Sequence, residues 1–168
     1  MHVACQPVRM SFVRAGESPD VRLSSRGGAW IVDTVVFRPL VEMEIHKAQR
    51  LRYSVSLLCI ATNGRAHEMH QDAAASPLAE RITALLRSTD ALAHWERSTL
   101  ALLLVDAEVM NLPSIVDRLT TRLEILRWSA GGACYPKTTA HPEELFHQAQ
   151  DLMMQAEKDG GNRLYLPS

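Results

Sequence analysis

The apolar positions along the chain change their spacing several times, and each change predicts a new element. From Phe37 to Arg50 they recur every three or four residues, which is typical of a helix with one buried side. Val55 to Ala61 is a continuous apolar run with the length of a buried strand. Leu92 to Trp95 and Thr99 to Val105 are two further strands, and the polar Glu96-Arg97-Ser98 between them predicts a hairpin.

Prolines mark where the remaining helices begin. Ser76-Pro77 opens one helix, because serine caps a helix and proline fits its first position, and Pro113 and Pro142 open two more. The two remaining strands are Leu126 to Cys134, interrupted by Gly131-Gly132, and Arg163 to Leu166. The order of elements predicts an α+β fold, in which helices flank an antiparallel-rich sheet of five strands.

The first part of the chain has no such pattern. Residues 1–32 carry proline, glycine, serine and arginine without a clear period, apart from one short candidate strand near Met10 to Arg14. We therefore predict an N-terminal extension over residues 1–32, partly flexible, followed by one domain over residues 33–168.

Composition narrows the class of protein. The chain of 168 residues is 46% hydrophobic and 22% charged with a net charge of -1, which indicates a globular domain without bulk attraction to nucleic acid. Its three cysteines are scattered, so neither a disulfide framework nor a zinc site is predicted. No segment is apolar for long enough to act as a signal peptide or membrane span. We expect a cytoplasmic protein that binds neither nucleic acid nor membrane.

The order of these elements is similar to that of the GGDEF domain, the domain of diguanylate cyclases. This domain has the nucleotidyl-cyclase palm, with a ferredoxin-like core. The resemblance covers roughly Asp33 to Leu166. Three segments carry it: Glu42-Met-Glu-Ile-His-Lys-Ala-Gln-Arg50, Trp128-Ser-Ala-Gly131, and Glu143-Glu-Leu145 with Ala149, Ala156, Gly160 and Asn162. They resemble the family's leading helix, its Ser-Ile-Gly strand and its last helix.

The residues that the family uses for catalysis are replaced in this chain. The signature Gly-Gly-Asp/Glu-Glu-Phe falls on Glu96 to Leu100, where Glu96 and Arg97 put bulk in the space that two glycines leave for the nucleotide. The family's first metal aspartate falls on Ala61, and its phosphate-contacting lysine falls on Glu157. Two divalent cations need several anionic oxygens. The resemblance therefore implies a degenerate domain with no cyclase activity, no metal and no cofactor.

The family's inhibitory site for cyclic di-GMP has its counterpart. Arg87-Ser-Thr-Asp90 has the family's Arg-x-x-Asp pattern at the family's distance before the signature position, and Arg118 aligns with a further family arginine. Guanidinium groups bind phosphate and the guanine Hoogsteen edge, and a carboxylate accepts hydrogen bonds from guanine N1 and N2. The resemblance thus implies a bacterial signal-transduction receptor that binds the nucleotide cyclic di-GMP through Arg87, Asp90 and Arg118.

Other interpretations remain open from the sequence. Arg87 and Asp90 can instead cap a helix end and pair with each other, and Arg118 can belong to a solvated helix face. Trp95 and Arg97 can form a partner-binding tip in an interaction or dimerisation module, or Trp95 can fold onto the sheet. Residual nucleotide binding or cyclase activity is a third possibility. The polar segment His67 to Asp72 is predicted as a surface loop rather than a metal site.

Overall fold

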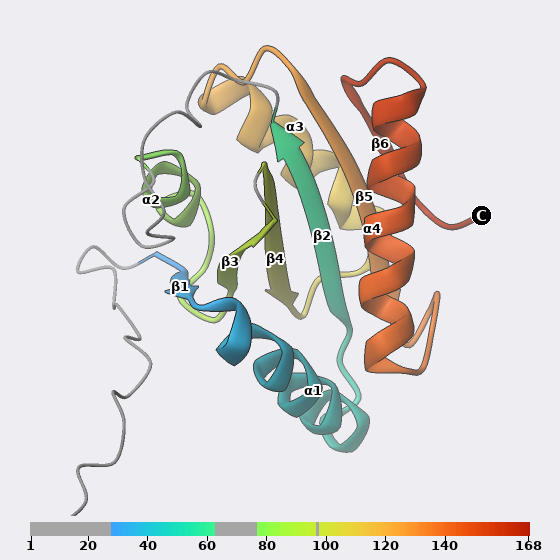
Figure 1. Cartoon of the computed structure of the whole chain (residues 1–168). Helices are drawn as coiled ribbons and strands as arrows, with labels where there is room; N and C mark the ends of the chain where they lie inside the picture. The colour runs from blue at the N-terminus through green and yellow to red at the C-terminus, as the bar shows by residue number, and fades with distance from the viewer. Residues whose placement is uncertain (1–27, 63–76, 97) are drawn as a thin grey trace, which may run out of the picture.

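The chain folds around one six-stranded sheet with the strand order β1-β3-β4-β2-β5-β6 (Figure 1). This computed structural model describes residues 28–62, 77–96 and 98–168. The strands are β1 Trp30–Val32, β2 Val55–Thr62, β3 Ala91–Glu96, β4 Thr99–Val105, β5 Trp128–Tyr135 and β6 Arg163–Tyr165. The helices are α1 Thr34–Leu51, α2 Pro77–Thr83, η3 Val109–Asn111 (a 3₁₀ helix), α3 Leu112–Arg122 and α4 Pro142–Lys158. The predicted strand near Met10 and the segment His67 to Asp72 lie outside the described residues.

The pairing of the strands confirms the predicted α+β class with a mainly antiparallel sheet. Strand β2 is central and pairs antiparallel with β4 and β5, and β3 and β4 form the predicted hairpin. The two edge strands, β1 and β6, pair parallel with β3 and β5. The prediction of five strands is wrong by one, because β1 lies in the part predicted as an extension. Its three residues are too few to show a two-residue period.

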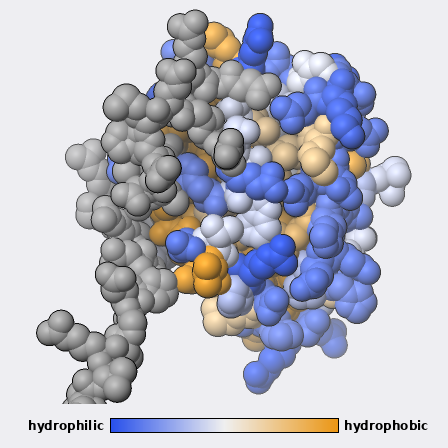
Figure 2. All heavy atoms as spheres, viewed as in Figure 1, coloured by the Kyte–Doolittle hydropathy of each residue, from blue (hydrophilic) through white to orange (hydrophobic). Residues whose placement is uncertain are grey.

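Helices cover both faces of the sheet, which explains the continuous apolar run in β2. Neighbouring side chains of a strand point to opposite faces. Leu57, Cys59 and Ala61 accordingly join the core beneath α1 and α4, whereas Leu58 and Ile60 join the core beneath α2 and α3. Every residue of β2 is buried. The outer surface over α4 is mostly hydrophilic in Figure 2, as expected of a helix with one buried side.

A close contact between backbones fixes α4 on the sheet. A Cβ atom at Gly131 would lie 2.2 Å from the carbonyl oxygen of Ala149 and 2.2 Å from the amide nitrogen of Met153. Only glycine therefore allows α4 to approach β5 this closely. Strand β5 is continuous through both glycines, so the predicted interruption at Gly131-Gly132 is wrong.

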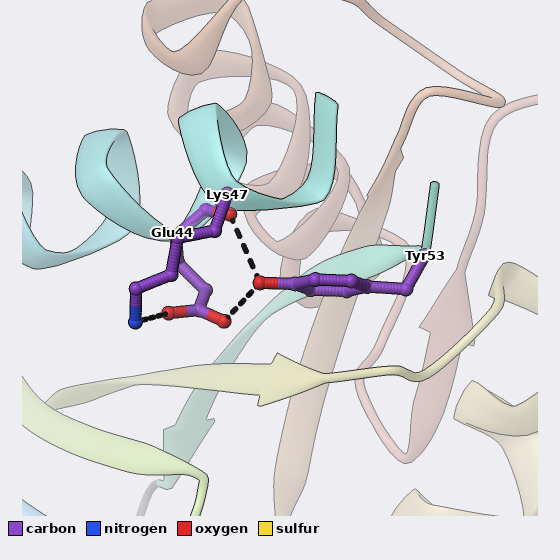
Figure 3. A network of polar contacts seen from close by, with 3 residues as sticks. All are labelled: Glu44, Lys47 and Tyr53. Carbon is purple, nitrogen blue, oxygen red and sulfur yellow. Dashed lines mark hydrogen bonds and ion pairs between the residues drawn. The ribbon is translucent and has the colours of Figure 1, made fainter. Parts of the chain in front are cut away.

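A polar network holds the C-terminal half of α1 to the connection that leads into β2 (Figure 3). The Tyr53 hydroxyl donates to Glu44 Oε1 at 2.5 Å, and Lys47 Nζ lies 3.0 Å from Glu44 Oε2. Burial, followed by the hydrogen bond to Glu44, raises the pKa of Tyr53. The buried Glu44 carboxylate is thus paired with a cation and a hydroxyl, which is the condition for burying a charge at low cost.

Candidate functional site

Asp90 lies at the start of β3 and ties three parts of the chain together. Its side chain is buried, with 4% of the residue exposed. Its Oδ2 atom accepts from the Arg87 amide at 2.9 Å, and its Oδ1 atom accepts from the Val105 amide at 3.0 Å. The Asp90 amide in turn donates to the Arg87 carbonyl at 3.0 Å. One carboxylate thereby closes the turn before β3 and attaches it to the end of β4. We call this region the Asp90 end of the sheet.

Two positive charges act on this carboxylate. Burial raises the pKa of Asp90, and the two amide hydrogen bonds and the positive charges of Arg87 and Arg118 oppose that rise. Arg118 lies on α3, so its charge comes from a helix that is remote from Arg87 in the sequence. Arg87 and Arg118, two of the residues predicted for the inhibitory-type site, are thus close enough to Asp90 for their charges to influence its pKa. Arg87 and Arg118 are both exposed, so each guanidinium group is accessible to a ligand.

The position of Asp90 changes the part that it can play. The sequence predicts that its carboxylate accepts hydrogen bonds from a guanine base. In the structure each carboxylate oxygen already accepts a backbone N–H, and the side chain is buried. An oxygen so placed organises the loop that carries Arg87. The bond to Val105 joins segments 15 residues apart, and the Arg-x-x-Asp pattern carries no signal for it.

The opposite end of the sheet, where β3 turns into β4, has different chemistry. Ala61 on β2 lies directly between Thr99 on β4 and Ser129 on β5, and all three are buried. This row offers hydroxyl groups and a methyl group but no carboxylate. Glu96, at the tip of β3, is exposed and accepts a hydrogen bond from the Gln150 side chain at 3.0 Å. We call this region the hairpin end.

Among the described residues, no further acidic or thiol group completes a metal site at the hairpin end. Glu157 stands at the position where the resemblance expects the family's phosphate-contacting lysine, and it is exposed on α4. Burial, followed by the charge of Glu96, raises the pKa of the Cys59 thiol to about 12, so this thiol stays protonated at neutral pH. Within residues 28–62, 77–96 and 98–168, no three His, Cys, Asp or Glu side chains are close enough to hold a metal ion.

Trp95, a candidate partner-binding residue, packs into the molecule. Its ring stacks on Phe146 with centroids 4.9 Å apart and meets the edge of Phe37 at 6.2 Å. The Arg38 guanidinium carbon lies 5.0 Å from the centroid of the Trp95 ring. The cluster joins β3 to α1 and α4. Of the two interpretations of Trp95, the structure favours the one in which it folds onto the sheet. Arg97, the second candidate, lies outside the described residues.

None of the helices in the described ranges is both long and apolar enough to cross a membrane.

The sequence and the fold both match one known family. A family model described as "Diguanylate cyclase, GGDEF domain" matches residues 70–163. No curated protein sequence matches the chain.

Solved structures of GGDEF domains share the fold at low sequence identity. The domain of YfiN (TpbB) from Pseudomonas aeruginosa is 20% identical, with a TM-score of 0.69 over 81% of this chain and 96% of that chain. The FimX domain from Pseudomonas aeruginosa is 19% identical, with a TM-score of 0.64 over 82% of this chain and 94% of that one. The domain of DgcB from Caulobacter crescentus, solved in complex with c-di-GMP, is 10% identical, with a TM-score of 0.64 over 90% and 98%.

The family match over more than half of the sequence, together with the shared fold, shows that this chain belongs to the GGDEF domain family.

Proposed function

We propose that this GGDEF domain binds cyclic di-GMP through Arg87 and Arg118 and does not synthesise it. The observation that carries the proposal is that two exposed arginines from different elements, one before β3 and one on α3, both act by charge on one buried carboxylate at the Asp90 end. Asp90 is a positioning residue in this proposal: its hydrogen bond to the Arg87 amide fixes the backbone from which that side chain extends.

The chemistry of the ligand fits this pair of arginines. Cyclic di-GMP presents two phosphodiesters and two guanine bases. A guanidinium group donates in parallel to two phosphate oxygens, or to O6 and N7 of guanine. Cyclic di-GMP offers two such groups several acceptors at separate points, whereas a single small anion offers one charged centre. The DgcB complex with c-di-GMP, which shares this fold, supports the choice of ligand.

The hairpin end supports the second half of the proposal, that the domain is not an enzyme. Cyclisation of GTP requires cations that neutralise the triphosphate, and such cations bind to several anionic oxygens. Ala61, Thr99 and Ser129 supply none, although they occupy the row next to the signature turn. We therefore expect no cyclic product when the protein is incubated with GTP and Mg²⁺ or Mn²⁺ and the mixture is separated by chromatography.

Isothermal titration with cyclic di-GMP tests the receptor function directly. The wild-type chain should release or absorb heat on binding. Arg87→Ala and Arg118→Ala should each weaken affinity by about thirtyfold, because each removes a charge-assisted contact of about 2 kcal/mol. Arg122→Ala, one helical turn beyond Arg118 on α3, is the matched control and should bind as the wild type does.

Two titration results would contradict the proposed receptor function. No heat at high protein concentration rules out this ligand, and equal losses for Arg118→Ala and Arg122→Ala show only a general attraction of anions to α3. Formation of cyclic product from GTP refutes the inactive assignment separately, whatever the titration shows.

The alternative is an interaction module that binds no nucleotide. The inward packing of Trp95 disfavours the hairpin as its docking surface. A different surface, on α1, carries exposed apolar side chains.

A further inference from the structure

The loop that carries Arg87 is held from the side by residues that precede α1. It runs from Thr83, the last residue of α2, to Ala91, the first residue of β3, and we call residues 84–90 the Arg87 loop. Residues 28–32, which the sequence predicted as part of an extension, include β1 and contact the chain where this loop begins and where it ends. Figure 1 shows β1 at the edge of the sheet, next to β3.

Backbone hydrogen bonds fix the two ends of the Arg87 loop. The Ala29 amide donates to the Thr83 carbonyl at 3.1 Å, and the Trp30 amide donates to the Asp90 carbonyl at 3.1 Å. Gly28 makes the first of these contacts possible, because a Cβ atom there would lie 2.2 Å from the Thr83 carbonyl oxygen. The loop therefore begins and ends against three consecutive residues that precede α1.

The Trp30 side chain adds a contact inside the loop. Its indole Nε1 donates to the Ser88 carbonyl at 2.9 Å. Ser88 directly follows Arg87, so this bond holds the backbone after Arg87, whereas Asp90 Oδ2 holds the Arg87 amide itself. The indole is partly buried against the core beneath α1 and α4, so its own position is fixed by packing. The backbone of Arg87 is thus held on both sides.

We propose that Trp30 is a positioning residue for cyclic di-GMP: its indole N–H holds the Arg87 loop in the conformation from which the Arg87 guanidinium binds the ligand. This inference rests on the proposed receptor function and extends it to β1. A group that is held in place before binding loses less conformational freedom when the ligand arrives, so its contact is stronger. Trp30 need not touch the ligand to act in this way. The Arg-x-x-Asp pattern carries no signal for it, because Trp30 lies 58 positions before Ser88.

A positioning role differs in one respect from a general contribution to stability. A tryptophan that only stabilises the fold affects the contacts of Arg87 and Arg118 with the ligand alike. A tryptophan that positions the Arg87 loop affects the contact of Arg87 alone, because Arg118 lies on α3 and none of the contacts described above involves that helix. The decisive measurement therefore separates the two arginines.

Isothermal titration with cyclic di-GMP makes that separation. Trp30→Phe keeps an aromatic ring and removes the N–H donor, and affinity should fall about fivefold, the effect of one neutral hydrogen bond. In an Arg87→Ala background the same substitution should have no further effect, whereas in an Arg118→Ala background it should again cost about fivefold. Trp128→Phe, the same change at a half-buried tryptophan on β5 at the other end of the sheet, is the matched control and should bind as the wild type does.

Amide hydrogen exchange of the ligand-free protein tests the hold of Trp30 on the loop directly. The Arg87 amide bonds to the Asp90 side chain and the Asp90 amide to the Arg87 carbonyl. Trp30→Phe should speed the exchange of both amides and leave that of Leu102, in the middle of β4, unchanged. Unchanged exchange at both loop amides overturns the inference, whether or not the ligand binds.

The titrations distinguish a failure of this inference from a failure of the receptor function. If the wild type binds cyclic di-GMP and Trp30→Phe binds it equally well, the positioning role is wrong and the receptor function stands. Equal losses in the Arg87→Ala and Arg118→Ala backgrounds show a general effect on the fold and also overturn the positioning role. If the wild type binds no cyclic di-GMP, the receptor function fails, and the positioning role fails with it even where exchange shows that Trp30 holds the loop.

Discussion

The two ends of the sheet differ in whether they contain a buried charged group. At the Asp90 end a buried carboxylate has both oxygens bonded to backbone amides, and the positive charges of Arg87 and Arg118 act on it. At the hairpin end the corresponding buried row is Ala61, Thr99 and Ser129, with no charged group. Both ends are built from the same central strands. They differ in charge because the side chains at a few positions differ, while the strands that carry them are the same.

Under the proposed function, this difference explains how one fold can bind the ligand without the groups that cyclisation needs. A contact with the ligand requires only exposed guanidinium groups whose backbone is held in place. For Arg87, the hydrogen bond from its amide to Asp90 holds that backbone. Metal-assisted cyclisation requires several carboxylates in fixed positions, so replacing them removes it. The aromatic cluster around Trp95 stabilises the hairpin end by packing, which needs no charge at the nucleotide position.

Removing the carboxylate at the Asp90 end should have the largest effect. Asp90→Ala leaves the Arg87 and Val105 amides without an acceptor, and we expect the free energy of unfolding to fall by about 3 kcal/mol. Urea denaturation measures this change, with the exposed Asp117→Ala on α3 as the control that should stay near the wild-type value. A loss no larger than that of the control contradicts the assignment of Asp90 as the positioning residue.

Truncating the aromatic cluster should affect the hairpin end alone. Trp95→Ala removes the stack on Phe146 and the contact with Arg38, and we expect a loss of about 2.5 kcal/mol because the ring is only partly buried. Trp95→Phe should retain most of the stability. Cyclic di-GMP affinity, measured at a temperature where both variants are folded, should not change. If Trp95→Ala abolishes binding, the two ends are coupled and the comparison fails.

Adding a carboxylate at the hairpin end should also destabilise the protein. Ala61→Asp buries an ion beside two hydroxyl groups and no cation, and we expect a loss of about 2 kcal/mol at neutral pH. The loss should shrink in acid, where the new side chain is protonated. Ala61→Ser is the uncharged control. If Mg²⁺ restores the stability of Ala61→Asp in denaturation experiments, the hairpin end retains a latent metal site, against our proposal.

The smallest expected effect is a pH dependence specific to Asp90. Burial raises its pKa above the ordinary 3.8, so between 3.8 and the raised value the folded chain holds a proton that the unfolded chain has released. The part of the stability that depends on protonation of Asp90 is therefore fully present below pH 3.8 and is lost as the pH rises through the raised pKa, whereas the two amide hydrogen bonds have an acceptor in either state.

Comparison with Asp90→Asn isolates this dependence, because asparagine does not titrate. The free energy of unfolding of the wild type minus that of Asp90→Asn should be greatest at the acid end and should fall as the pH rises. A difference that is flat with pH, or that grows as the pH rises, indicates an unraised pKa and contradicts the balance of burial and hydrogen bonding described above.

Much of the fold was predictable because its signals are local. The apolar run of β2, the hairpin between β3 and β4, and the prolines that open α3 and α4 all lie where the sequence places them. Strand β1 was missed because three residues carry too little pattern. The continuity of β5 was missed because Gly131 weakens a strand by itself, and only the approach of α4 explains its presence.

The candidate site was predictable in its members but not in their arrangement. Arg87, Asp90 and Arg118 followed from the resemblance, and the charges of both arginines act on the Asp90 carboxylate. The bond from Asp90 to the Val105 amide had no signal, because any residue supplies a backbone N–H. Likewise the contact of Trp95 with Arg38 and Phe146 joins three elements that no local pattern links.

The sequence by itself determined the order of the helices and strands that follow β1, the family and the residue types at each end of the sheet, since periodicity and side-chain chemistry are properties of neighbouring positions. Only the tertiary structure decided that Asp90 holds a loop in place, that Trp95 is packed inward and that Val35, Met43 and Leu51 on α1 are exposed. Each of these depends on which distant segments of the chain pack together. Whether a polar group is buried or an apolar group is exposed is decided only by that packing.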